Sequence, residues 1–318
     1  MLQRLLRLAG SARSWFDNGA QTASPDGDRA TGVDWARLVP FVVVHFSCLA
    51  VIWVGWSPVA VAVAIGMYLL RAFFVTGFYH RYFSHRTFKT SRPAQFLFAV
   101  AGNSAAQRGP LWWAAHHRQH HRTSDHEGDP HSPHEHSLYW SHMGWITSRE
   151  NFRTRLELIP DLAKYPELRW LDRFDTLVPL AYAAFTFGLG ALLARVAPGL
   201  GTSGPQMLIW GFFVSTVILF HVTCLVNSAA HLMGRQRFKT TDESRNSLVV
   251  ALLTLGEGWH NNHHHYPAAT RQGFYWWEID VTYGVLKAMS WVGLIWDLAP
   301  VPRKVLEKGR LAAEAEAA

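Results

Sequence analysis

Histidines gather in three short clusters, and each cluster lies near the end of an apolar stretch of the chain. The clusters are H-R-Y-F-S-H at residues 80–85, H-R-Q-H-H at 117–121 and H-N-N-H-H at 260–264. Imidazole suits iron, zinc, copper or nickel, and it binds these ions in its neutral form at physiological pH. Eight histidines grouped in this way indicate a metal centre at a membrane surface, because packing alone does not explain them.

The spacing within the clusters makes the chemistry more specific. On a helix, the first histidine of H-x-x-H-H is three and four residues from the others, so all three can converge on one metal ion or on an adjacent pair. His80 and His85 are five residues apart and diverge by more than a third of a turn on an ideal helix. We therefore expect them to reach one site from opposite flanks, or the helix to unwind between them.

A fourth element, N-S-A-A-H at residues 227–231, ends the last long apolar stretch. A lone histidine there would be an ordinary interfacial residue, but the three clusters favour His231 as a ninth ligand. Asn227 lies four residues earlier on the same stripe of a helix, where its amide could hold a metal-bound water. The polar, turn-rich loop 124–136 is expected to be mostly exposed, with His131 as the residue best placed to support a ligand.

Four apolar stretches are long enough to cross a bilayer, which requires about 20 residues per helix. They cover about residues 39–56, 59–79, 177–196 and 207–230. The short connections within the first pair and within the last pair contain no Lys or Arg, whereas the other loops are basic. The positive-inside rule therefore places both termini, the long loops and every histidine cluster in the cytoplasm.

The composition agrees with a membrane protein: of 318 residues, 49% are hydrophobic and 17% charged, and the formal net charge is +7. We predict an all-α membrane protein with four transmembrane helices and a cytoplasmic helical cap that holds the histidine-rich site. Residues 1–36 are expected to form an N-terminal cytoplasmic segment with a basic amphipathic helix. Residues 37–300 are expected to form the membrane domain, and residues 301–318 a polar C-terminal tail.

Taken in order, these motifs resemble those of integral-membrane fatty acyl desaturases of the stearoyl-CoA (Δ9) type, in a bacterial-like form. The resemblance covers about residues 59–280 and includes D-P-H at 129–131, S-H-M-G-W at 141–145 and G-E-G-W-H-N-N-H-H at 256–264. It implies O2-dependent insertion of a cis double bond into a saturated acyl chain at two iron ions. The ligands that it implies are His80, His85, His117, His120, His121, His231, His260, His263 and His264, with Asn227 as a contact through water.

An acyl desaturase must hold its substrate dry and in one bent shape, because the carbons that lie beneath the metal ions decide where the bond forms. Ala64 and Tyr68, in the second apolar stretch, are candidates for the floor of such a tunnel. Candidates for contact with the substrate are Tyr68, Trp113, Trp145, Arg149 and Trp259. Animal acyl-CoA enzymes place two charged pairs near the CoA headgroup, and only Arg149 matches them here, so the carrier could be CoA, acyl carrier protein or a phospholipid ester.

The sequence shows no H-P-G-G haem signature of a fused cytochrome b5, so we expect electrons from a separate donor, ferredoxin-like or cytochrome b5-like. The expected location is a bacterial inner membrane, with several passes and no nucleic-acid partner. Two alternatives remain: a histidine-rich diiron hydroxylase of the alkane, sterol or carotenoid type, and a non-enzymatic metal transporter. The N-S-A-A-H and G-E-G-W-H-N-N-H-H segments favour desaturation, and a transporter would need ligands along a transmembrane path.

Overall fold

The computed structural model describes residues 15–20 and 32–317. The basic helix predicted for the N-terminal segment lies outside these residues. Within the described part, the chain is mostly helical. Its single sheet has two short antiparallel strands, β1 (Lys89–Thr90) and β2 (Ile295–Trp296).

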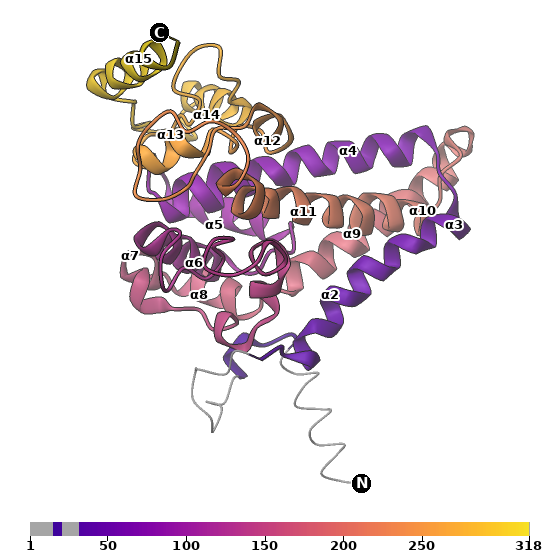
Figure 1. Ribbon diagram of the computed structural model, residues 1–318. Helices are drawn as coiled ribbons and strands as arrows, with labels where there is room; N and C mark the ends of the chain where they lie inside the picture. Colours follow the sequence, from indigo (N-terminus) through magenta and orange to yellow (C-terminus); the bar gives the residue numbers. More distant parts are fainter. Residues whose placement is uncertain (1–14, 21–31, 318) are drawn as a thin grey trace.

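Among the described residues, four helices are long and apolar enough to cross a membrane, as predicted: Arg37–Val54, Pro58–Ser84, Leu177–Val196 and Gly204–His231. They are built from α2 (Trp35–Ser47), η2 (Cys48–Ala50), α3 (Val51–Val54), α4 (Pro58–Phe73), η3 (Phe74–Ser84), α9 (Leu177–Val196), α10 (Gly204–Met207), η9 (Leu208–Val214), α11 (Ser215–Ser228) and η10 (Ala229–His231). Figure 1 shows these helices running together, with their short turns at the α3 and α10 end. Their outward faces carry large apolar side chains such as Trp53, 79% exposed, which suits contact with lipid.

Serine side chains start the helices after both short turns. The N–H of Ala60 donates to Ser57 Oγ, and Pro58 takes the first helical position, where its missing N–H leaves no gap. Ser203 begins α10 in the same way by accepting from the N–H of Gln206. Ser57 Oγ–H also donates to Gln206 Oε1 at 2.7 Å, so the two hairpins are joined at this end of the bundle.

The remaining helices gather at the other end of the four spans, and we call this part, residues 85–176 and 232–317, the head (Figure 1). Phe78, Phe83, Leu111 and Leu171 are fully buried where the head meets the spans. The helices of the head are α5 (Arg92–Asn103), α6 (Pro110–Thr123), α7 (Pro160–Ala163), α8 (Pro166–Arg173), α12 (Leu248–Leu253), α13 (His260–His265), α14 (Val281–Trp291) and α15 (Arg303–Ala317). The head also contains the short helical turns η4 (Trp140–Gly144), η5 (Trp145–Thr147), η6 (Arg149–Asn151) and η7 (Leu156–Leu158). Two further short turns lie outside it: η1 (Asn18–Ala20) and, between α9 and α10, η8 (Pro198–Leu200).

The segment expected as a polar tail, residues 301–318, is helical over Arg303–Ala317. Val305 is buried in a small core with Phe238 and Tyr275, and the Tyr275 hydroxyl donates to the carbonyl of Leu306 at 2.8 Å. The start of this segment therefore packs on the head. Its few apolar residues stand among charged ones, which is why the sequence reads as solvated.

Arg71 is a buried cation within the second span, and it contacts no carboxylate in the described part of the chain. Its guanidinium donates to the carbonyls of Met67 and Ser104, to Thr216 Oγ1 at 2.7 Å and to Ser215 Oγ at 2.6 Å. Ser104 is the C-terminal cap of α5, so the cation stabilises the negative end of that helix dipole. Arg71 thus joins α4, α5 and α11.

We expect Arg71→Leu to lower the midpoint of thermal unfolding of the purified protein, because each polar group left buried without a partner costs about 1–3 kcal/mol. Arg195→Leu is the matched control, since Arg195 is exposed near the end of α9. Circular dichroism in detergent measures both midpoints. An equal midpoint for the Arg71 variant and the native protein would contradict a structural role.

Candidate metal centre

The structure brings all nine predicted histidines together in two adjacent groups at the junction of the spans and the head. In each group the ligating nitrogens lie within 4.8 Å of one another. The five-histidine group contains His80, His85, His117, His121 and His263, and the four-histidine group contains His120, His231, His260 and His264. The nine residues come from η3, the residue that follows it, α6, η10 and α13, so segments far apart in sequence build both groups.

Each H-x-x-H-H motif divides between the two groups. On α6, His117 and His121 face the five-histidine group, while His120 faces the other. On α13 the division is reversed: His263 belongs to the five-histidine group, and His260 and His264 belong to the other. Positions i and i+4 lie on one side of a helix and i+3 on the other side of the same stripe. The spacing leaves open one metal ion or an adjacent pair, and the two adjacent histidine groups of the structure suit a pair.

The five-residue spacing of His80 and His85 fits a wider helix. Residues Phe74–Ser84 form a π-helix, and the N–H of His85 donates to the carbonyl of His80 at 3.3 Å, which is the i→i+5 bond of that form. The two rings have centroids 4.9 Å apart. Arg118 donates to the carbonyls of Phe83 and Ser84, so the end of this helix is satisfied. A local change of helix type, rather than an approach from opposite flanks, joins this histidine pair.

Helix α6 is held in place by a buried carboxylate. The N–H groups of Leu111 and Trp112 donate to Asp172 Oδ1 at 3.0 and 2.8 Å, so Asp172 caps the first turn from another helix. Gly109 makes this possible, because a Cβ there would lie 2.3 Å from the same oxygen. Burial raises the pKa of Asp172 to about 6.

The asparagines of H-N-N-H-H position helix α13, a role that the sequence analysis did not assign. Asn261 accepts from the N–H of Phe238 at 2.7 Å and donates to its carbonyl at 3.0 Å. Asn262 donates to the carbonyl of Gln272 at 3.0 Å and accepts from Asn246 at 2.8 Å. A six-residue helix has little stability of its own, so these side chains fix the direction of its histidines.

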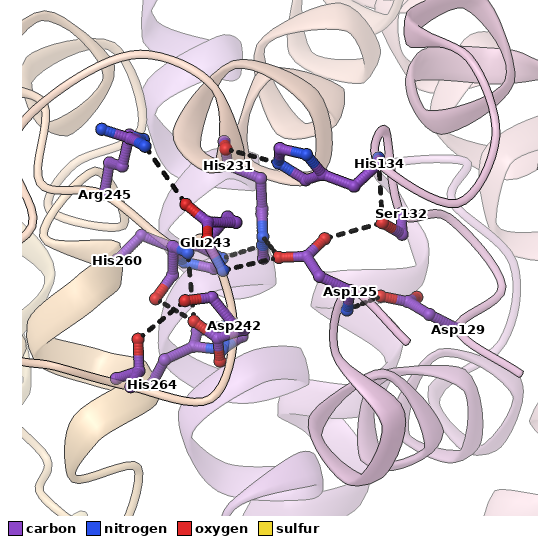
Figure 2. Close-up of polar contacts among 12 residues, drawn as sticks. Asp125, Asp129, Ser132, His134, His231, Asp242, Glu243, Arg245, His260 and His264 are labelled. Carbon is purple, nitrogen blue, oxygen red and sulfur yellow. Dashed lines mark hydrogen bonds and ion pairs between the residues drawn. The ribbon is translucent and has the colours of Figure 1, made fainter. Parts of the chain in front are cut away.

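Four ligating rings donate their Nδ1–H to a carboxylate. His231 pairs with Asp125 at 2.7 Å and His264 with Asp242 at 2.7 Å (Figure 2). His120 pairs with Asp129 at 3.0 Å, and His80 contacts Glu257. Such a bond sets the tautomer, so that the Nε2 lone pair points into the group. His264 Nε2 is buried and has no hydrogen-bond partner among the described residues, which suits a nitrogen that binds a metal ion.

The remaining geometry also fits metal ions. Ring nitrogens of different histidines face each other closely. His85 Nε2 lies 2.7 Å from His117 Nε2, and His231 Nε2 lies 3.0 Å from His260 Nε2. For six of the rings, burial lowers the pKa far below the ordinary 6.5, so these rings are neutral at physiological pH. They are His85, His117, His121, His260, His263 and His264. Neutral imidazole is the form that binds metal ions. The donor set therefore fits two adjacent ions.

The four carboxylates were missed in the sequence analysis. Asp129 belongs to the D-P-H motif and Glu257 to G-E-G-W-H, so both had a signal. Loop 124–136 is not as exposed as predicted, because Asp125, Asp129 and His131 are buried. Burial alone would raise the pKa of Asp125, but His231, the Ser132 hydroxyl and the N–H of Glu243 together outweigh burial and lower that pKa to about 2. Burial lowers the pKa of His131 to about 3, and this neutral ring lies against His120 with centroids 4.3 Å apart.

Two cavities meet beside the histidines. The large cavity, about 470 Å³, lies between α2, α9, η9 and α11, and the small cavity, about 40 Å³, lies between α4, η3 and α11. They share Trp113, His117, Thr223 and Asn227 as lining residues. The large cavity is mostly apolar, with Phe41, Val44, Leu180, Ala183, Phe212 and Phe220 in its wall. A volume of this size is typical of a small-molecule site.

The predicted substrate contacts are only partly at these cavities. Trp113 and Trp145 line the large cavity, and Trp113 stacks on His117 with ring centroids 5.0 Å apart. Arg149, Tyr68 and Trp259 do not line either of the two. Arg149 is exposed, the Tyr68 hydroxyl donates to the carbonyl of Leu253, and the Trp259 indole N–H donates to the carbonyl of Ile279 at 2.8 Å.

The alanine expected at the tunnel floor is not in the wall of either cavity. Ala64 is buried but lines neither cavity, and α4 presents Ala72 to the small cavity instead, with Val75 and Thr76 from η3. Ala72 lies eight residues further along the helix, about 12 Å nearer the histidines. The sequence places both alanines on one span and does not show where the cavity ends.

Four helices able to cross a membrane, an apolar cavity and two groups of imidazoles at its end describe a membrane protein that can hold metal ions beside an apolar ligand. The chain matches the model of the "Fatty acid desaturase" family over residues 54–290, and it belongs to that family.

Curated relatives cover most of the chain. The sn-2 palmitoyl-lipid 9-desaturase of Nostoc sp. (strain 36) is 34% identical over 277 residues, 85% of this chain and 92% of that protein. The sn-1 stearoyl-lipid 9-desaturase of Synechocystis sp. is 34% identical over 274 residues, 86% and 82% of the two chains. A chloroplastic palmitoyl-monogalactosyldiacylglycerol delta-7 desaturase of Arabidopsis thaliana is 35% identical over 271 residues, 84% and 69% of the two chains. All three names give a lipid as the carrier, and they differ in the acyl chain and in the position of the double bond.

Proposed function

We propose that this fatty acid desaturase inserts a cis double bond at the Δ9 position of a saturated acyl chain, with O2 and two electrons, at two iron ions held by the nine histidines. The observation that carries the proposal is the meeting of the large and small cavities at Trp113, His117 and Asn227, directly beside both groups. An extended acyl chain that filled both cavities would pass the ligating rings in its middle. Two relatives with 9-desaturase in their names support the position.

The apolar cavity walls would bind the acyl chain and exclude water. Each buried methylene stabilises the complex by about 0.8 kcal/mol. Trp113, fixed against His117, would hold the chain at the turn between the two cavities. Holding one segment of the chain still beside the ligands decides which carbons react.

The ligands have distinct tasks in this scheme. Bound iron would supply the oxidising power that hydrogen removal from an unactivated methylene requires and that side chains lack. Asn227 lines both cavities next to the histidines, so its amide could hold a water there. The four carboxylates would keep the tautomer of their histidines, and the six rings whose pKa burial lowers would offer neutral nitrogens as ligands.

The carrier, the donor and the orientation follow from chemistry and from relatives. We infer that the acyl group arrives as an ester or thioester of a lipid, CoA or acyl carrier protein, because relatives are named as acyl-lipid and acyl-CoA desaturases. We infer that electrons come from a separate ferredoxin-like or cytochrome b5-like protein. The basic loops favour a head on the cytoplasmic side of a bacterial inner membrane.

The test is expression in a host that lacks unsaturated fatty acids, followed by lipid mass spectrometry with localisation of the double bond. We expect a cis monounsaturated chain with the bond between carbons 9 and 10. Separate analysis of the CoA, acyl carrier protein and lipid pools shortly after induction identifies the carrier. Hydroxylated chains, or no new product from an iron-loaded protein, would overturn the proposal.

A further inference from the structure

The two histidine groups differ sharply in the charge that surrounds them. In the four-histidine group, three of the four rings donate to a carboxylate. His231 donates to Asp125 and His264 to Asp242 (Figure 2), and His120 donates to Asp129. In the five-histidine group, only His80 contacts a carboxylate among the described residues, namely Glu257. The group with fewer ligands therefore has more acidic support.

The three aspartates around the four-histidine group keep their full charge. Asp125 accepts from Ser132 Oγ–H at 2.7 Å and from the N–H of Glu243 at 2.9 Å. Asp129 accepts from the N–H of Asp125, and Asp242 from that of Ser244. All these donors are neutral, and among the described residues no ion pair joins a Lys or Arg side chain to any of the three aspartates, whose ion pairs are with histidines. Their exposed fractions are 8%, 2% and 8%, so water screens them weakly.

Glu257, in contrast, is largely neutralised. Arg81 donates to Glu257 Oε1 at 2.9 Å and contacts Asp280 at 2.9 Å. Arg81 and both acids are inaccessible to solvent or nearly so, with Arg81 side chain exposure of 1%. Two carboxylates and one guanidinium leave a net charge of −1 beside the five-histidine group, against −3 beside the other.

We propose that the two metal positions are inequivalent, and that the four-histidine group binds a divalent cation more tightly than the five-histidine group and fills first. This rests on the proposed role of the histidines as metal ligands. Removal of one acidic partner of a ligating histidine typically costs about 10–100-fold in affinity. The four-histidine group has two more carboxylates without a cationic partner, and these therefore outweigh the single extra imidazole of the five-histidine group. At the four-histidine group, a water held by Asn227 can take the place of the missing fifth imidazole.

The aspartates also link two loops through this position. Asp125 belongs to the loop after α6, and Asp242 belongs to the loop after η10. Asp125 accepts from the N–H of Glu243, and the His126 ring contacts the carbonyl of Thr241 at 2.9 Å. The first bound cation would therefore stabilise both loops through His231 and His264, whereas the second would not.

The experiment titrates the full, metal-free protein in detergent with Co2+ alone, and follows cobalt absorbance with a competing chelator. We expect two equivalents whose dissociation constants differ by at least about 100-fold. Asp242→Asn keeps an acceptor for His264 but removes the charge, and should weaken the tight step about 10–100-fold. Glu257→Gln should weaken only the second step. Asp297→Asn, an exposed acid paired with Lys89, is the control and should leave both steps unchanged.

Ligand variants identify the positions. His264→Ala should remove the tight step and leave the weak one, and His85→Ala should do the reverse. Two steps of equal affinity, a tight step lost in His85→Ala, or a tight step unchanged in Asp242→Asn would each overturn the proposal. If an alanine variant does not fold, the two charge-removing variants still decide the matter. Because the readout is metal affinity, a protein that binds two ions but makes no desaturated product would refute the proposed function alone.

Discussion

His120→Ala and His263→Ala are each expected to abolish desaturation while the protein still folds in the membrane. The two residues belong to different groups, so each variant loses one ligand from one metal position. Loss of an outer partner of a ligating histidine already costs about 10–100-fold in affinity or activity, and loss of the ligand itself should cost more. Product analysis in a host without unsaturated fatty acids measures the effect, and elemental analysis measures the iron content.

His136→Ala is the matched control for this pair. His136 is an exposed histidine of the loop that follows α6, and it belongs to neither histidine group. Its variant should retain full activity and full iron content. Retained activity in either ligand variant would remove that residue from the metal centre. A ligand variant with two bound iron ions and no activity would point to a different task for the ring.

Ala72→Leu is expected to shift the products towards shorter acyl chains. In the proposed function, the carboxyl end of the substrate is attached to its carrier, and the small cavity would receive the methyl end. Ala72 is 2% exposed and lines this cavity of about 40 Å³. The substitution adds three carbons, which take up at least the space of the two methylenes that a shorter substrate lacks. With about 0.8 kcal/mol per methylene, the preference between chains that differ by two carbons should change about tenfold.

The control for this variant is Ala64→Leu on the same helix. Ala64 is also buried, at 7% exposure, but it lines neither cavity. Fatty acid methyl esters from both variants, measured by gas chromatography against the native enzyme, give the chain-length distribution. Equal distributions for Ala72→Leu and the native protein would show that the acyl chain does not end in the small cavity. A shift in the Ala64 variant alone would restore the floor predicted from the sequence.

Much of the fold could be predicted from local patterns, because a membrane makes strong demands on sequence. A helix that crosses hydrocarbon must be apolar for about 20 residues, and this gave the four spans to within a few residues at most ends. The second span was predicted to end at residue 79 and continues to Ser84, since the π-helix carries polar residues that the head buries. Hydropathy does not show this continuation of the helix, because the continuation depends on residues of the head that pack around it.

The site shows the same limit. Histidine spacing identified eight ligand candidates and their presence favoured His231 as a ninth, and all nine lie in the two groups. The partition into five and four depends on how α6 and α13 lie against each other, and no spacing rule contains that relation. The carboxylates were missed for the same reason: Asp125 and His231 are 106 residues apart in sequence, and Glu257 and His80 are 177 apart.

By itself, the sequence determined that this is a membrane protein with four spans and a histidine-rich site of the desaturase family, because residue types and short spacings carry that information. The tertiary structure alone decided which rings share a group, which acids contact them and where the apolar cavities end. These properties depend on distances between segments that are remote along the chain. Ala64 and Ala72 illustrate the difference: the same residue type on one helix lies outside the cavities in one case and lines a cavity in the other.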